Sequence, residues 1–194
     1  MPMYSGEHAE TSGSARRLLR SALSFVGMVV LVIAMSWVMR TFIFGAYEIP
    51  TGSMETTIMP GERVFAERIS YVAGEPEQGD IVTFDDPEIQ GRTLIKRVIA
   101  TGGQTVDLVD GAVVVDGVPL DEPYVNGEPS YPLVPAYGLD ITYPYTVPEG
   151  ELWLMGDNRT SSSDSRYFGS VPVSNVSGKA VFTYWPIGSI GVLK

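Results

Sequence analysis

The sequence has no cysteine and a single histidine, His8, which lies in the polar N-terminal region. The lack of cysteine excludes disulfide bonds, a thiol nucleophile and thiolate metal ligands. Because no histidine follows His8, no serine–histidine–aspartate triad can form farther along the chain, and the commonest ligand of catalytic zinc is missing. The carboxylates show no EF-hand-like spacing. We therefore expect no metal site, and any serine nucleophile must be activated by another kind of base.

Lysine is also scarce, since Lys96, Lys179 and Lys194 are the whole set. Lys96 lies in the apolar run TLIKRVIA, where a strand would point it to the same face as Leu94 and Val98. A free lysine is neutral only about once in 2,500 at pH 7, so a lysine base needs apolar surroundings that lower its pKa by roughly two to three units. The alternative is a lysine whose stem packs on the strand while its ammonium group stays in water.

Positive charge is outnumbered, because 23 acidic residues against 13 lysines and arginines give a formal net charge of -10. No basic stripe is available to neutralise phosphates, so nucleic acid is excluded as a partner. The 194 residues suffice for one compact domain with an anchor or tail.

One long uncharged run, residues 21–39, has about the length that crosses a bilayer as a helix, and we predict a transmembrane helix there. Arg16, Arg17 and Arg20 precede it and Arg40 follows it, so the positive-inside bias places the N-terminus in the cytoplasm. A buried core helix and a cleaved signal peptide are the alternatives.

This span predicts three parts: a cytoplasmic tail over residues 1–20, the helix over residues 21–39 and an exocytoplasmic domain over residues 41–194. The outer part reads as mostly β, because short runs rich in Val, Ile, Tyr and Phe alternate with Gly, Pro, Asp and Asn. A Pro- and Tyr-rich stretch over residues 116–147 suits an insertion into the β core. The expected strands are RVFAERI, DIVTFDD, TLIKRVIA, TVDLV, AVVVDGVPL, ELWLMG and KAVFTYWP.

Two further segments contain residues suited to catalysis. In YEIPTGSMETTIMPGERV, Pro50 to Gly52 place Ser53 on a constrained turn from which its hydroxyl can project into solvent. In MGDNRTSSSDSRYFGSV, Ser162, Asp164 and Arg166 alternate and would face one way in an extended stretch, where the serine could orient a lysine amine and the other two could pair. Alone, each segment also fits an ordinary surface loop.

Together these segments resemble the bacterial type I signal peptidase (leader peptidase) family of membrane-anchored serine–lysine proteases. PTGSM, GDIVTF, IKRVIATGG and GDNRTSSSDSRYFG occur in that family's order behind one N-terminal span. The resemblance covers residues 47–184 apart from the Pro- and Tyr-rich stretch. It implies a signal-peptidase-like β catalytic domain.

The resemblance also implies roles for individual residues. Ser53 would be the nucleophile and Lys96 the general base. The Ser53 backbone N–H and the Thr51 hydroxyl would form the oxyanion hole. Ser162 would orient Lys96. Asp164 and Arg166 would support the site, and shallow apolar pockets for substrate would be lined by Tyr47, Ile49, Leu94 and Ile95.

The implied activity is cleavage of signal peptides from exported preproteins after small residues at positions -3 and -1, without a cofactor. The implied partners are those signal peptides and membrane lipid, with a functional link to the secretion translocon. The implied location is the cell membrane. The sequence departs from the family pattern at two points: Thr56 stands where the family usually has proline, and PGER stands where GDR is commoner. These departures leave open whether the enzyme is a general housekeeping peptidase or one dedicated to a narrower set of exported substrates.

Two rival interpretations remain. A serine–lysine self-cleaving repressor-type domain shares the dyad, but it would be soluble and usually fused to a DNA-binding domain. The second rival is a membrane-tethered β module that binds a partner and has lost catalysis. The presence of both Ser53 and Lys96 counts against it.

Overall fold

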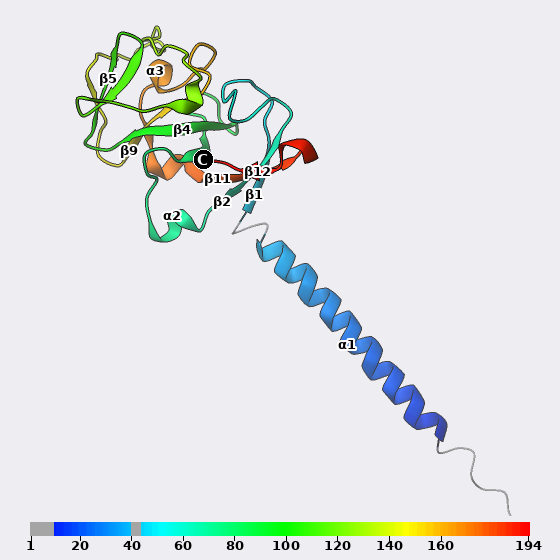
Figure 1. The fold of residues 1–194 in the computed structure, drawn as a ribbon. Helices are drawn as coiled ribbons and strands as arrows, with labels where there is room; N and C mark the ends of the chain where they lie inside the picture. The colour runs from blue at the N-terminus through cyan, green and yellow to red at the C-terminus, as the bar shows by residue number, and fades with distance from the viewer. Residues whose placement is uncertain (1–9, 40–43) are drawn as a thin grey trace, which may run out of the picture. The chain divides into compact units, whose positions relative to one another are not determined.

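The structure is a computed structural model that describes residues 10–39 and 44–194. The chain divides after Phe42 into an N-terminal unit and a second unit that begins at Ile43, and each is described by itself. The second is called the β unit below. Figure 1 shows both ribbons with their labels.

The described part of the N-terminal unit forms one helix, α1 (Glu10–Val38). Its segment Arg17–Val38 has a mean hydropathy of 2.2 and no buried residues, and among the described residues it is long and apolar enough to cross a bilayer. The predicted span over residues 21–39 lies in this helix up to Val38. The helix begins within the predicted tail, because the strong helix formers ARRLLR precede the apolar run. His8 and Arg40 lie outside the described residues.

The β unit contains two antiparallel sheets. Within residues 44–194 the larger sheet has eight strands in the order β1-β2-β11-β3-β4-β9-β10, with β12 paired to β11. The strands of this sheet are β1 (Phe44–Glu48), β2 (Arg63–Glu67), β3 (Ile81–Asp85), β4 (Thr93–Thr101), β9 (Glu151–Met155), β10 (Val171–Pro172), β11 (Val176–Trp185) and β12 (Gly191–Val192). The mostly β fold predicted from the sequence is confirmed.

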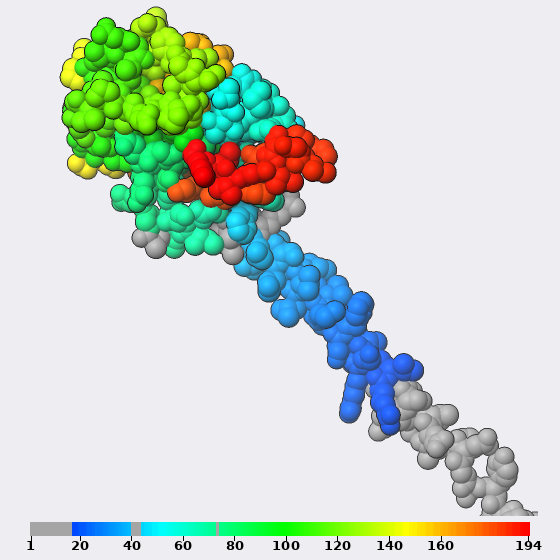
Figure 2. Space-filling view, in the orientation of Figure 1, coloured from blue at the N-terminus to red at the C-terminus, as the bar shows by residue number. Residues whose placement is uncertain are grey.

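The smaller sheet has the order β7-β6-β5-β8. Its strands are β5 (Thr105–Val109), β6 (Ala112–Val115), β7 (Val118–Pro119) and β8 (Tyr145–Thr146). The stretch 116–147 therefore supplies two short strands to a sheet that already begins at β5. A turn at Asp116–Gly117 joins β6 to β7, so the segment AVVVDGVPL forms a hairpin and not one strand. In Figure 2 these green and yellow-green atoms gather at one end of the β unit.

Short helical turns complete the β unit: α2 (Ser70–Ala73), α3 (Ser165–Phe168), η2 (Pro123–Val125), η3 (Val173–Asn175) and η4 (Ile187–Ser189). All seven predicted strand segments contain strands of the structure. The prediction missed β1, β8, β10 and β12. Three of these have only two residues, and β1 is a half-exposed strand whose FGAYE sequence carries glycine and alanine.

Strand β4 organises the site because it is buried on both faces. Its central residues from Ile95 to Ala100 are all buried, between β3 on one side and β9 on the other. Successive side chains of a strand point to opposite faces. Lys96 and Arg97 therefore carry their charges into two different parts of the interior.

Candidate active site

Ser53 lies in the turn between β1 and β2, and apolar residues fix this turn to the core. Met54 and Ile58 are fully buried, and the Ile58 N–H donates to the Met54 carbonyl at 2.8 Å. Glu55 N–H donates to the Gly52 carbonyl at 3.1 Å, which closes the turn around the serine. Ser53 is only 9% exposed, so its hydroxyl is more enclosed than the sequence suggested.

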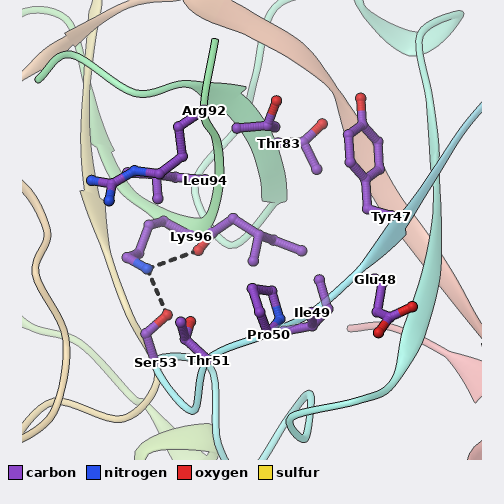
Figure 3. A pocket seen from close by; sticks show the side chains of 12 residues that line it. Tyr47, Glu48, Ile49, Pro50, Thr51, Ser53, Thr83, Arg92, Leu94 and Lys96 are labelled. Atoms are coloured by element: carbon purple, nitrogen blue, oxygen red, sulfur yellow. Dashed lines mark hydrogen bonds between the residues drawn. The ribbon is translucent and has the colours of Figure 1, made fainter. Parts of the chain in front are cut away.

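Lys96 reaches Ser53 from β4 across 43 residues of sequence. Its Nζ donates to Ser53 Oγ at 2.7 Å and to the Ile95 carbonyl at 3.0 Å. Figure 3 shows the lysine side chain extending toward Ser53, with Thr51 beside the serine. The lysine is 3% exposed. The structure thus brings together the serine and the lysine that the sequence singled out.

Burial lowers the pKa of Lys96 to about 8. The main cause is loss of hydration of the ammonium group, opposed by the carboxylates of Asp164, Asp157 and Asp86, which favour the charged form. A pKa of about 8 leaves about a tenth of the lysine neutral at pH 7. This proportion is hundreds of times larger than for a free lysine, as a general base requires.

A pocket with a volume of about 160 Å³ adjoins this pair. That volume is close to the roughly 150 Å³ of a cavity known to hold benzene, so the pocket suits small apolar groups. Figure 3 shows Leu94 on the same side as Lys96, and Tyr47 at the opposite end. The lining residues are Tyr47, Glu48, Ile49, Pro50, Thr51, Ser53, Thr83, Arg92, Thr93, Leu94, Ile95 and Lys96.

All four residues expected to line substrate pockets, Tyr47, Ile49, Leu94 and Ile95, therefore line this one. Sequence reasoning missed Glu48 and Arg92, which add charge to its wall, and Thr83. Thr83 is buried, and its hydroxyl donates to the Gly178 carbonyl at 3.3 Å. Its position as the fourth residue of DIVTFDD, a predicted strand, was the only signal available.

Asp164 and Arg166 form the ion pair that their charges suggested. Arg166 Nε and Nη2 each donate to an Asp164 oxygen at 2.9 Å, and Nη2 also donates to the Arg159 carbonyl at 2.8 Å. They do not lie in an extended stretch, and that expectation was wrong. Asp164 is the N-cap of α3 and accepts the Arg166 backbone N–H, because a carboxylate before a helical turn satisfies a free donor.

Ser162 is buried, but its hydroxyl has no hydrogen-bond partner within the described part of the chain. No hydrogen bond joins it to Lys96, whose amine donates to Ser53 and Ile95, and the role of Ser162 in orienting the lysine stays a prediction. Ser162 still lies close to the Ser53 turn. A Cβ added to Gly156 would be 2.3 Å from Ser162 Oγ and 2.4 Å from the Ser53 carbonyl oxygen.

Arg97 and Asp157 form a second buried ion pair that sequence reasoning did not assign. Arg97 Nε and Nη2 donate to the two Asp157 oxygens at 2.8 and 2.7 Å, and Tyr124 stacks 3.9 Å from the guanidinium carbon. Asp157 also accepts the hydroxyl of Thr57, in the turn that carries the serine. This pair ties β4, the loop after β9 and the Ser53 turn together.

Within residues 10–39 and 44–194, no group of three or more acidic, histidine or cysteine side chains is arranged to hold a metal ion. The pocket instead offers a hydroxyl, an amine and apolar walls. This combination suits nucleophilic attack by a serine activated by a lysine.

Comparison with known proteins agrees with this chemistry. The sequence profile of the family described as "Signal peptidase, peptidase S26" matches residues 22–185. The chain belongs to this signal peptidase family. A probable signal peptidase I-1 of Synechocystis is 39% identical, over 86% of this chain and 83% of that protein. Signal peptidase I of Mycobacterium tuberculosis is 34% identical, over 96% of this chain and 80% of that protein.

A solved structure of a signal peptidase I from Enterococcus faecalis is 32% identical and covers 54% of this chain and 96% of its own, with a TM-score of 0.43. Membership of the signal peptidase family makes this chain a serine peptidase, and the predicted enzyme class is confirmed. The rival repressor-type domain and non-catalytic module are set aside. The apolar helix α1 is consistent with a membrane-anchored signal peptidase.

Proposed function

We propose that this signal peptidase cleaves its substrate through a serine–lysine dyad, with Ser53 as nucleophile and Lys96 as general base. The observation that supports this most directly is the 2.7 Å contact between Lys96 Nζ and Ser53 Oγ, made by a lysine that is 3% exposed. A buried amine at hydrogen-bond distance can accept the hydroxyl proton as the serine attacks.

The neutral Lys96 amine takes the Ser53 proton while Oγ attacks the scissile carbonyl carbon. The oxyanion that forms is held by the Ser53 N–H and the Thr51 hydroxyl, which lines the same pocket. The protonated amine then gives its proton to the leaving amine of the mature protein. The acyl-enzyme is released by a water molecule that the same lysine deprotonates.

The substrates are the signal peptides of exported preproteins, with small residues at positions -3 and -1. The pocket supports this assignment, because about 160 Å³ lined by Ile49, Leu94 and Ile95 gives small apolar side chains an apolar site beside Ser53. Glu48 and Arg92, which also line the pocket, would contact polar groups of the bound signal peptide.

Asp164 and Arg166 act as supporting residues. Their ion pair is almost completely buried, and Asp164 also accepts the Gly156 N–H at 3.0 Å. It thereby holds the loop that packs against the Ser53 turn. The pair touches neither Ser53 nor the pocket, so it supports the site through the loop.

Helix α1 anchors the enzyme in the cell membrane, with residues 1–20 in the cytoplasm and the catalytic domain, residues 41–194, outside. The apolar segment Arg17–Val38 supports an anchor, and the arginines that precede it support this orientation. Membrane lipid and the secretion translocon are the corresponding partners.

The test is cleavage of a synthetic preprotein with alanine at positions -3 and -1 by the full chain in detergent or lipid. Ser53→Ala and Lys96→Ala should abolish cleavage at the expected bond while the proteins remain folded. Lys179→Ala is the matched control, because Lys179 is a strand lysine that pairs with Asp80 away from the pocket. Cleavage that survives both dyad substitutions would refute the proposal. Binding of the preprotein without cleavage by the wild type would likewise contradict the proposed mechanism.

A further inference from the structure

Asn158, in the loop after β9, contacts the turn that carries the nucleophile. Its side-chain Nδ2 donates to the Gly52 carbonyl at 3.0 Å and to a carboxylate oxygen of Glu55 at 3.3 Å. Its backbone N–H donates to the Ser53 carbonyl at 3.2 Å. One residue thus binds the carbonyl groups on both sides of Ser53, across more than 100 residues of sequence.

The Gly52 carbonyl has a special place in this turn, because it belongs to the same peptide unit as the Ser53 N–H. A trans peptide unit is planar, and its C=O and N–H point in opposite directions. Fixing the direction of the Gly52 oxygen therefore fixes the direction of the Ser53 N–H. Among the described residues no backbone acceptor takes that N–H, which leaves it available to a substrate oxyanion.

The Gly52 oxygen accepts two hydrogen bonds, from the Glu55 N–H at 3.1 Å and from Asn158 Nδ2 at 3.0 Å. The first bond lies within the turn and moves with it. The second comes from the loop after β9, which the buried ion pairs of Asp157 and Asp164 anchor to Arg97 of β4 and to Arg166 of α3. Two donors on a carbonyl also polarise the peptide unit and strengthen its N–H as a donor.

The close approach of the loop depends on Gly156. A Cβ at this position would lie 2.4 Å from the Ser53 carbonyl oxygen, closer than atoms can pack. The absence of a side chain at Gly156 lets the loop approach the turn, and Asn158, two residues later, then reaches both carbonyls. The glycine and the asparagine are parts of one contact.

We propose that Asn158 is a positioning residue that aims the Ser53 N–H of the oxyanion hole by holding the Gly52 carbonyl. This inference rests on the proposed serine–lysine mechanism. Asn158 does not line the pocket and touches no reacting atom, so it acts on the transition state through the peptide unit. Its loss should lower kcat and leave substrate binding and the titration of Lys96 as they are.

The test compares Asn158→Ala and Asn158→Asp in the full chain, in detergent. Misdirecting one oxyanion donor should lower kcat on the order of 10- to 100-fold, somewhat less than deleting a donor outright. KM should stay within about twofold in both variants, and the apparent pKa of the rate profile should not move in Asn158→Ala, which adds no charge. Asn158→Asp keeps the size but places an oxygen against the Gly52 oxygen, so its loss should equal or exceed that of alanine.

A peptide aldehyde with alanine at the two small-residue positions gives an independent readout. Its carbonyl carbon bonds to Ser53 Oγ, and its oxygen enters the oxyanion hole. The affinity for this aldehyde should fall by about the same factor as kcat in both variants, while a non-covalent substrate peptide binds as before.

Glu55→Gln is the matched control, because it alters the second acceptor of the same Nδ2 and leaves the Gly52 contact in place. It should keep kcat within about twofold. Four results would overturn the inference: wild-type kcat in both Asn158 variants, a loss that appears in KM, a moved apparent pKa in Asn158→Ala, or an equal loss of kcat in Glu55→Gln. Ser53→Ala separates the two proposals, since an active Ser53→Ala refutes the dyad itself.

Discussion

Replacing Lys96 with methionine should stabilise the protein at neutral pH, by an amount that shrinks as the pH rises. Burial lowers the pKa of Lys96 from 10.5 to about 8, so the unfolded chain binds a proton there that the folded chain has released between those two pH values. The free energy of unfolding of the wild type therefore rises with pH across this window, and below about pH 8 the whole cost of the buried ammonium is present.

The size of this cost follows from the two pKa values. At about 1.4 kcal/mol per unit, the step from 10.5 to about 8 corresponds to about 3 kcal/mol. Lys96→Met has no group that titrates at this position. Its stability relative to the wild type should therefore decrease by about 2 to 3 kcal/mol between about pH 7 and pH 10, whatever the methionine gains or loses in packing.

The assay is urea unfolding of the full chain in detergent, followed by tryptophan fluorescence, since Trp153 is fully buried in the β unit. At each pH the free energy of unfolding of the wild type is subtracted from that of Lys96→Met, so the contributions of all other titrating groups cancel. Lys179→Met is the control, because it removes a strand lysine that pairs with Asp80 and keeps both Lys96 and its contact with Ser53, so its difference from wild type should lack the decrease expected for Lys96→Met. A flat difference for Lys96→Met would show that the lysine titrates like an exposed one.

Three further predictions concern activity and packing. The value of kcat/KM for preprotein cleavage should rise with pH and level off above about pH 8, as Lys96 loses its proton, and a flat pH–rate profile would contradict the lysine base. Gly156→Ala should lose most activity and about 1 to 3 kcal/mol of stability in urea unfolding, because its Cβ would clash with the Ser53 carbonyl; an active, stable variant would refute the close approach. Asp157→Asn should lower the free energy of unfolding by about 3 to 5 kcal/mol, because Arg97 is left buried without its partner. Glu48→Gln, in an exposed pair, should cost less than about 1 kcal/mol, and equal losses would contradict the role of burial.

The sequence was sufficient to single out Ser53 and Lys96, which the structure brings together, because the signals for each were local. Lys96 is flanked by Leu94, Ile95 and Val98, and a charged residue in such a run is buried wherever the strand is covered on both faces. Ser53 follows Pro50, Thr51 and Gly52, which favour a turn in almost any context. The residues alone did not show that these two segments meet. That expectation came from the resemblance to one family, in which the same motifs occur in the same order.

The parts that sequence reasoning missed are those defined by a distant partner. Strands β8 and β10 have two residues each, and no periodicity can reveal an element that exists only because Thr105 or Leu152 lies opposite. Ser162, Asp164 and Arg166 alternate as a strand would, yet Asp164 caps α3 instead. A short carboxylate offers the backbone a local acceptor, and this local bond outweighs a weak extended preference.

Asn158 illustrates the same limit at the active site. In GDNR, asparagine and glycine are ordinary turn residues, and the turn alone accounts for both. What distinguishes Gly156 and Asn158 from ordinary turn residues is their contact with the Ser53 turn. A side chain at Gly156 would prevent this contact, because its Cβ would lie 2.4 Å from the Ser53 carbonyl oxygen. Local preference and tertiary contact favour the same residues here. The sequence therefore could not separate the turn that Asn158 forms from the peptide unit that it holds.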